Sequence, residues 1–199
     1  MSLLKPSAEP LEFASFADLE RAALACTRCP LAETRTQVVF GAGDPDAALM
    51  FIGEGPGEQE DRDGVPFVGR AGRLLTSLID EIGLDRDAVY IANVVKCRPP
   101  GNRDPLPLEI ETCRPYLEAQ IELIDPAVVV TLGNFATRLL LDTKEGITKL
   151  RGREFPFREH AVLIPTFHPA AVLRSGGATL AQTRSDFVQV KRALARTRP

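Results

Sequence analysis

The chain has 199 residues, 44% of them hydrophobic and 26% charged, and a formal net charge of −3. This composition is ordinary for a globular protein, and the net charge alone gives no sign of nucleic-acid binding. Residues 1–10 contain no apolar core of a secretory signal, and no run approaches the about 18 apolar residues of a membrane span. We therefore expect a cytoplasmic protein without a membrane segment.

Four short, continuously apolar runs alternate with segments of helical periodicity. The apolar runs are typical of strands covered on both faces, and they occupy residues 48–52, 89–92, 127–132 and 161–164. The helical segments are residues 70–82, 107–124, 134–141 and 179–195, although Pro115 indicates a bend or a break in the second. The alternation predicts an α/β three-layer sandwich with a central four-stranded parallel sheet flanked by helices. We expect one domain over residues 16–199 and a flexible N-terminal extension over residues 1–15.

The four cysteines of the chain would suffice for one four-coordinate site. They are Cys26, Cys29, Cys97 and Cys113. In a cytoplasmic protein such a set favours a metal or cluster site over disulfides, with buried unlinked thiols as the alternative. Structural zinc prefers two short Cys-x2-Cys pairs and this chain has one, whereas iron–sulfur clusters accept wider spacings. The spacing alone leaves the identity of the metal open.

Polar residues follow the predicted strands at the edge where ligands bind in open parallel sheets. Glu54 lies in a glycine-rich turn after the first strand, Asn93 follows the second, and His168 follows the fourth. A carboxylate, a carboxamide and an imidazole are therefore expected to meet at one edge. Each has a simpler interpretation on its own, as a tight turn, a turn residue or a loop histidine.

These segments together resemble the family 4 uracil-DNA glycosylases, the iron–sulfur-containing bacterial and archaeal type. The resemblance extends from about Ala25 to the final helix. It rests on residues 53–58 (Gly-Glu-Gly-Pro-Gly-Glu), 66–72 (Pro-Phe-Val-Gly-Arg-Ala-Gly), 92–99 (Ala-Asn-Val-Val-Lys-Cys-Arg-Pro), 131–133 (Thr-Leu-Gly) and 168–170 (His-Pro-Ala).

The resemblance implies an enzyme of base excision repair. It would hydrolyse the N-glycosidic bond of deoxyuridine in single- or double-stranded DNA, release free uracil and leave an abasic site. The four cysteines stand where the family keeps the ligands of a [4Fe–4S] cluster. We expect the protein to act as a monomer.

The resemblance also implies roles for individual residues. His168 would donate a hydrogen bond to uracil O2 as negative charge develops there, and Glu54 would stabilise the cationic sugar or position the attacking water. Asn93 would read the O4 and N3–H edge of uracil. Phe67 would stack on the flipped base, although it could also be an ordinary core residue, and Gly55 would let the backbone approach the base.

Three further residues are implied at the edges of the site. Glu60 would help to exclude the methyl group of thymine. Leu173 or Arg174 would fill the space that the flipped base leaves in the DNA stack, and basic residues nearby would contact phosphates.

Two other classes of protein remain alternatives. A non-catalytic DNA-binding protein could keep the same fold, pocket and cluster without turnover, and a small iron–sulfur protein could transfer electrons. Glu54 and His168 argue against the first. Glu54 also separates the chain from family 5 glycosylases, which carry an apolar residue there.

Overall fold

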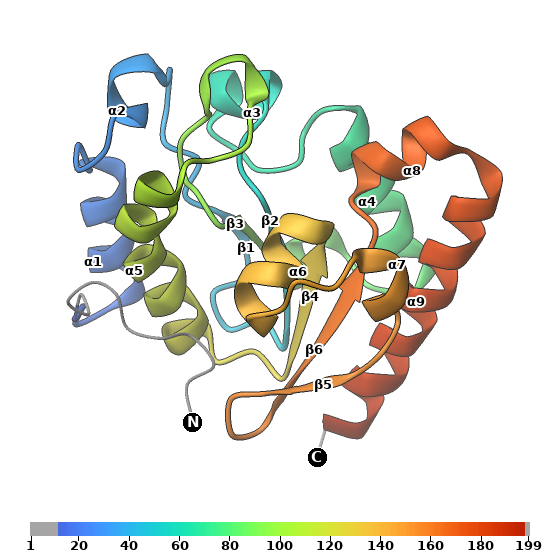
Figure 1. Ribbon diagram of the computed structural model, residues 1–199. Coiled ribbons are helices and arrows are strands. Elements are labelled where there is room, and N and C mark those ends of the chain that lie inside the picture. Colours follow the sequence, from blue (N-terminus) through green and yellow to red (C-terminus); the bar gives the residue numbers. More distant parts are fainter. Residues whose placement is uncertain (1–11, 198–199) are drawn as a thin grey trace.

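A six-stranded mixed sheet forms the centre of the computed structural model, which describes residues 12–197 (Figure 1). The strands are β1 (Ala42–Gly43), β2 (Leu49–Gly53), β3 (Tyr90–Asn93), β4 (Val128–Leu132), β5 (Phe155–Phe157) and β6 (Ala161–Thr166), in the order β1-β3-β2-β4-β6-β5. The helices are α1 (Phe16–Leu24), α2 (Leu31–Thr34), α3 (Glu58–Asp63), α4 (Arg70–Glu81), α5 (Pro107–Ile124), α6 (Asn134–Leu141), α7 (Ile147–Leu150), α8 (Pro169–Ser175) and α9 (Gly177–Thr197), with 3-10 turns at Arg86–Ala88 and Pro100–Asn102.

The four expected strands are the four central ones, and they are parallel in the order β3-β2-β4-β6. The expected four-stranded parallel sheet is therefore extended by two strands, because β1 and β5 pair antiparallel at its edges. These edge strands are only two and three residues long, too short to show a periodicity in the sequence. Pro156 lies in β5, as is usual for an edge strand, where a missing N–H is tolerated.

Helices cover both faces of the sheet, which confirms the three-layer arrangement. Along β2, Met50 and Ile52 pack in one apolar cluster with residues of α5 and α6. Leu49 and Phe51 point the other way, into a cluster with α4 and α9. The Phe51 ring stacks on Phe187 of α9 with centroids 5.7 Å apart. Burying each such ring stabilises the fold by about 1.5–3 kcal/mol, and burial on both faces explains the uninterrupted apolar runs.

The helix predictions hold, apart from one detail. Helix α4 ends just before Gly83, whose φ of +82° is a left-handed conformation that glycine adopts without strain. Helix α5 passes through Pro115 without interruption, so the helix does not break there, and the alternative of a bend stays a prediction. Pro115 and its neighbours Tyr116 and Leu117 are buried, and this packing maintains the helix despite the missing backbone donor.

Most of the expected N-terminal extension lies outside the described residues. Within residues 12–15, the Ser15 hydroxyl accepts a hydrogen bond from Asp18 N (3.2 Å) and caps α1. The boundary at residue 15 remains a prediction. Among residues 12–197, no helix is both long enough and apolar enough to span a bilayer.

Candidate active site and cysteine cavity

An open cleft of about 1090 Å³ lies at the carboxyl ends of the parallel strands. Its lining contains seven of the eight non-cysteine residues that the sequence singled out: Glu54, Gly55, Glu60, Phe67, Asn93, His168 and Arg174. The eighth, Leu173, lies on α8 with 42% of its surface exposed and is not part of the lining. The cleft is large enough for a nucleotide-sized ligand.

His168 enters the cleft as a neutral hydrogen-bond donor. It is the N-cap of α8, where its Nδ1 accepts a hydrogen bond from Ala170 N (3.1 Å). An Nδ1 that accepts cannot carry the proton of the neutral ring, so the proton is on Nε2. Burial lowers the pKa of His168 to about 4, helped by the charge of Arg174 and opposed by Glu60. The side chain can therefore donate from Nε2 at neutral pH without carrying a charge.

Asn93 brings an unpaired acceptor to the cleft. Its residue is 1% exposed, and its Oδ1 has no hydrogen-bond partner within the described part of the chain. Gly53 makes room for this side chain, because a Cβ there would lie 2.4 Å from Asn93 Oδ1 and 2.7 Å from Phe67 Cζ. Sequence reasoning treated Gly53 only as part of a turn. A buried, unpaired acceptor is costly unless a ligand supplies the missing donor.

Phe67 is held in an unusual backbone conformation beside His168. Its φ is +53°, which is left-handed and uncommon for a bulky residue. The backbone of Gly72 packs closely against this loop: a Cβ at Gly72 would lie only 1.7 Å from the Phe67 carbonyl oxygen. The Phe67 and His168 rings have centroids 5.6 Å apart with planes inclined by 34°. Strain of this kind is characteristic of binding sites that the surrounding structure holds in place.

Glu60 ties together the two loops that form this side of the cleft. Its Oε1 accepts hydrogen bonds from Val68 N (3.1 Å) and Gly69 N (3.2 Å), and its Oε2 accepts one from Gly57 N (3.1 Å). The carboxylate therefore joins the start of α3 to the loop that carries Phe67. This role was not foreseen from the sequence.

Glu54 directly follows β2, and its pKa is raised by burial and then by the negative charge of Asp104. Asp104 also lines the cleft and was not foreseen from the sequence, because it lies in an irregular loop away from the strand ends.

Two further residues of the cleft lining, Asn134 and Arg138 of α6, were likewise given no role from the sequence. Asn134 Oδ1 accepts a hydrogen bond from Ile147 N (2.8 Å), which attaches α7 to the rim of the cleft.

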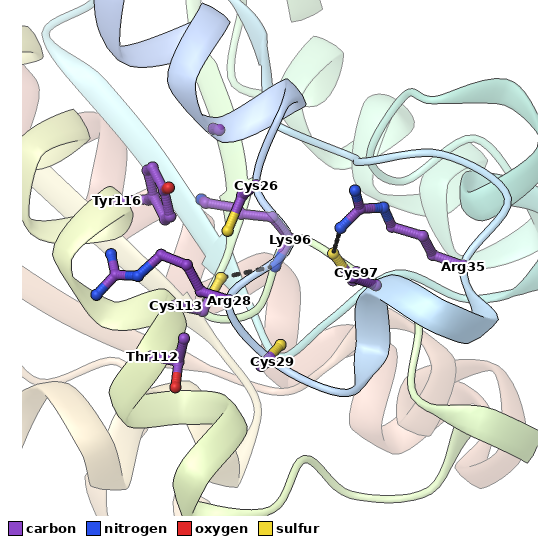
Figure 2. A pocket seen from close by; sticks show the side chains of 11 residues that line it. Cys26, Arg28, Cys29, Arg35, Lys96, Cys97, Thr112, Cys113 and Tyr116 are labelled. Atoms are coloured by element: carbon purple, nitrogen blue, oxygen red, sulfur yellow. Dashed lines mark hydrogen bonds between the residues drawn. The ribbon is translucent and has the colours of Figure 1, made fainter.

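The cysteines line a second, separate cavity (Figure 2). Cys26 follows α1, Cys29 precedes α2, Cys97 lies in the loop after β3, and Cys113 belongs to α5. Figure 2 shows their sulfur atoms around a common space. No residue lines both this cavity and the strand-end cleft. The four thiols therefore bring residues of the N-terminal segment and of the middle of the chain to one cavity that does not reach the cleft.

The surroundings of the sulfur atoms suit thiolate ligands. Arg35 Nη1 donates to Cys97 Sγ (3.3 Å), and Lys96 N donates to Cys113 Sγ (3.2 Å). Burial raises the pKa of Cys113 to about 12 and also raises the pKa of Cys97, so without a metal these groups would stay protonated. A metal that coordinates such thiols removes their protons.

Lys96 places a buried positive charge beside this cavity. Its residue is 2% exposed, and its Nζ donates to Asn93 O (2.9 Å) and to Gln120 Oε1. Within residues 12–197 it forms no ion pair with a carboxylate. A buried cation needs a compensating negative charge, and thiolates bound to metal would supply it.

Comparison with known proteins identifies the chain. A model of the Uracil DNA glycosylase superfamily matches residues 40–195, which include the whole lining of the strand-end cleft. A Type-4 uracil-DNA glycosylase from Thermotoga maritima is 53% identical over 151 residues, 75% of this chain and 79% of that protein. One from Sulfurisphaera tokodaii is 47% identical over 167 residues, 80% of this chain and 76% of that protein. A Type-5 uracil-DNA glycosylase from Thermus thermophilus is 31% identical over 172 residues, 76% of each chain. The chain therefore belongs to the uracil-DNA glycosylase superfamily and, within it, to the type-4 family.

Proposed function

We propose that this protein hydrolyses the N-glycosidic bond of deoxyuridine in DNA, releasing uracil and leaving an abasic site. One observation carries the proposal: a neutral histidine donor and an unpaired amide acceptor line the same cleft, beside an aromatic ring. The names of the type-4 relatives support it.

Asn93 would select uracil by its hydrogen-bonding edge. Uracil N3–H is a donor, and the unpaired Oδ1 of Asn93 is the acceptor that it requires. The amide nitrogen of the same side chain would donate to O4. Cytosine presents an acceptor at N3 and an amino donor at C4, so both contacts would be lost. Phe67 would stack on the flipped base, and Gly55 would let the backbone approach it.

His168 and Glu54 would act on the bond itself. Departure of uracil leaves negative charge on its carbonyl oxygens, and the Nε2–H of a neutral His168 would donate to O2 as that charge develops. Glu54, once deprotonated, would stabilise the positive charge on the sugar or orient the attacking water. Burial and Asp104 both raise the pKa of Glu54, so protonation of this group would contribute to the loss of activity at low pH.

Helix α8 would carry the contacts with DNA beside the flipped nucleotide. Leu173 is exposed and Arg174 lines the cleft, and both lie within two turns of His168. Leu173 would fill the vacated position in the base stack, while Arg174 would contact phosphate. We expect the protein to act as a monomer on single- or double-stranded DNA.

The four cysteines would hold a [4Fe–4S] cluster. Among residues 12–197, no three His, Cys, Asp or Glu side chains lie close enough together to hold a single metal ion. Four thiols that line one shared cavity are the ligand set that such a cluster requires. When bound, the cluster would crosslink α1, the loop after β3 and α5, with Lys96 balancing its negative charge.

A direct assay tests the proposal. The purified protein is incubated with a uracil-containing oligonucleotide and then with alkali, which cleaves DNA at abasic sites. We expect scission at uracil for the wild type and for His160→Ala, which changes the other histidine of the chain, and strong loss for His168→Ala. Binding of the oligonucleotide without scission by the wild type would instead favour a non-catalytic uracil-binding protein.

A further inference from the structure

Helices α7 and α9 both pack against β6 (Figure 1). An ion pair between Arg151, which is 19% exposed, and the buried Asp186 links the end of α7 to α9. The Asp186 side chain on α9 is 1% exposed. Arg151, at the end of α7, donates from Nε to Asp186 Oδ2 (3.0 Å) and from Nη2 to Oδ1 (2.5 Å), and it also donates to the backbone carbonyl of Gln182. Neither charged residue lines the cleft.

The Arg151–Asp186 ion pair contacts the two residues that immediately precede His168. Thr166 Oγ1 donates to Asp186 Oδ2 (2.7 Å), and the Arg151 guanidinium carbon lies 5.4 Å from the centre of the Phe167 ring. The two residues that precede His168 are therefore each held by one member of the ion pair. These contacts connect α9 to the two residues that precede the residue we propose as the donor to uracil.

Gly152 shows that the arrangement is closely packed. A Cβ at this position would lie 2.4 Å from Asp186 Oδ1, and its φ of +69° is left-handed. Its backbone N donates to Pro165 O (2.8 Å), which attaches the residue after Arg151 to β6. The ion pair is thus enclosed by backbone on one side and by the end of β6 on the other.

Stability alone is a poor reason for these buried charges. Asp186 is almost fully removed from water and Arg151 partly so, which is costly, and the attraction between them often only offsets that loss. Burial raises the pKa of Asp186, which reflects the same cost, although Thr166 and Arg151 oppose the shift. A network that contributes little net stability but fixes a short segment is suited to orienting a catalytic group.

We propose that Arg151, Asp186 and Thr166 form a positioning network that holds His168 so that its Nε2–H points at the leaving base. The inference rests on the proposed glycosylase function. It adds three positioning residues that do not touch the substrate. Displacing a catalytic group by about 1 Å can slow a reaction by about 100-fold, so a weakened network should affect the bond-breaking step.

The test compares Thr166→Val with Thr166→Ser. Valine keeps the shape but loses the donor to Asp186, whereas serine keeps the hydroxyl. Two quantities are measured well below the melting temperature of each variant: the single-turnover rate of uracil release, and the Kd for an oligonucleotide containing 2′-fluorinated deoxyuridine, which resists hydrolysis. We expect Thr166→Val to slow release by about 10-fold or more with Kd within about twofold, and Thr166→Ser to recover most of the rate.

A matched control and a spectroscopic readout separate positioning from stability. Glu154→Gln removes an exposed ion pair with Arg196 (2.6 Å) that also joins α9 to the segment after α7, and it should leave the rate unchanged. In a His160→Gln background, only His168 contributes imidazole NMR signals, and Thr166→Val should shift them.

The possible results are distinct. A Thr166→Val protein with wild-type rate and unchanged His168 signals would overturn the positioning role. The same conclusion would follow if Thr166→Val lowered the melting temperature but left the rate of uracil release unchanged. It would also follow if Glu154→Gln slowed uracil release as much as Thr166→Val does. Absence of uracil release from the wild type would refute the proposed function itself.

Discussion

The neutral state of His168 is open to a quantitative test by pH. Its pKa of about 4 in the folded protein lies well below the ordinary 6.5. Between these values the unfolded chain binds a proton that the folded protein does not, so stability increases with pH across this window and is lost as the pH falls through it. The full difference corresponds to at most about 3 kcal/mol, of which about 2 kcal/mol is lost between pH 7 and pH 5.

The perturbation is His168→Gln, which keeps a polar side chain but does not titrate. Denaturant unfolding of both proteins at pH 7 and pH 5 gives the change in the free energy of unfolding for each. We expect the wild type to lose about 2 kcal/mol more than the variant over this interval. Comparing the two proteins removes the contribution of every other titrating group, including the cysteines.

An NMR titration of the imidazole gives the same answer directly. In a His160→Gln background, the His168 signals should remain those of the neutral Nε2–H form down to pH 5. A midpoint near 6.5, or equal pH dependence of stability in the wild type and His168→Gln, would refute the reasoning that burial keeps this group neutral.

Three further predictions concern the cleft and the cysteine cavity. Asp104→Asn removes a charge that raises the pKa of Glu54, so the acid limb of the pH–rate profile should move to lower pH, which single-turnover rates from pH 4.5 to 8 would show. A movement to higher pH would contradict this assignment. Gly72→Ala would place a Cβ 1.7 Å from the Phe67 carbonyl oxygen, so we expect a loss of about 2 kcal/mol or more in the free energy of unfolding and slower uracil release. Unchanged unfolding and activity would show that the loop is not fixed by this contact. Cys97→Ala should lower stability and DNA affinity before it lowers the rate of bond cleavage, measured by melting temperature, Kd and single turnover; a selective loss of turnover would contradict a structural role.

Matched controls are available for these substitutions. Gly177→Ala adds a methyl group where nothing lies within 4 Å, so it should leave the free energy of unfolding nearly unchanged. Asp142→Asn removes an acidic charge outside the cleft lining and should leave the acid limb in place. An equal effect in the control and the test variant would show that the change is not specific to the contact.

The central part of the fold follows from local pattern, whereas its edges do not. The run at 48–52 was predictable because it is continuously apolar, as in a strand buried on both faces, and the helix at 70–82 because it buries residues with a helical period. The strand at 155–157 was not, because three residues carry no period and its pairing with β6 is a tertiary contact. Pro115 shows the opposite case, in which a strong local signal was overridden by packing around α5.

The candidate site was predictable to the extent that topology brings it together. Glu54 and His168 follow β2 and β6, and Asn93 is the last residue of β3; these parallel strands end at the same edge. Side-chain contacts between segments far apart in the chain leave no motif or periodicity in the sequence from which they could be predicted. Asp186 contacts Arg151 across 35 positions, and neither residue belongs to a motif that the sequence suggested.

Lys96 explains how a cysteine cavity that does not reach the cleft can still affect it. Its backbone N donates to Cys113 Sγ, and its side chain donates to the carbonyl oxygen of Asn93, the last residue of β3. The same ammonium group therefore contacts the residue that would read uracil and lies next to the residues that would bind the cluster. If the negative charge of the cluster were lost, a buried cation would be left without compensation, and the Asn93 carbonyl that it contacts would be directly affected. On the proposed function, the cysteines would therefore support the shape of the base pocket through Lys96 without taking part in bond cleavage.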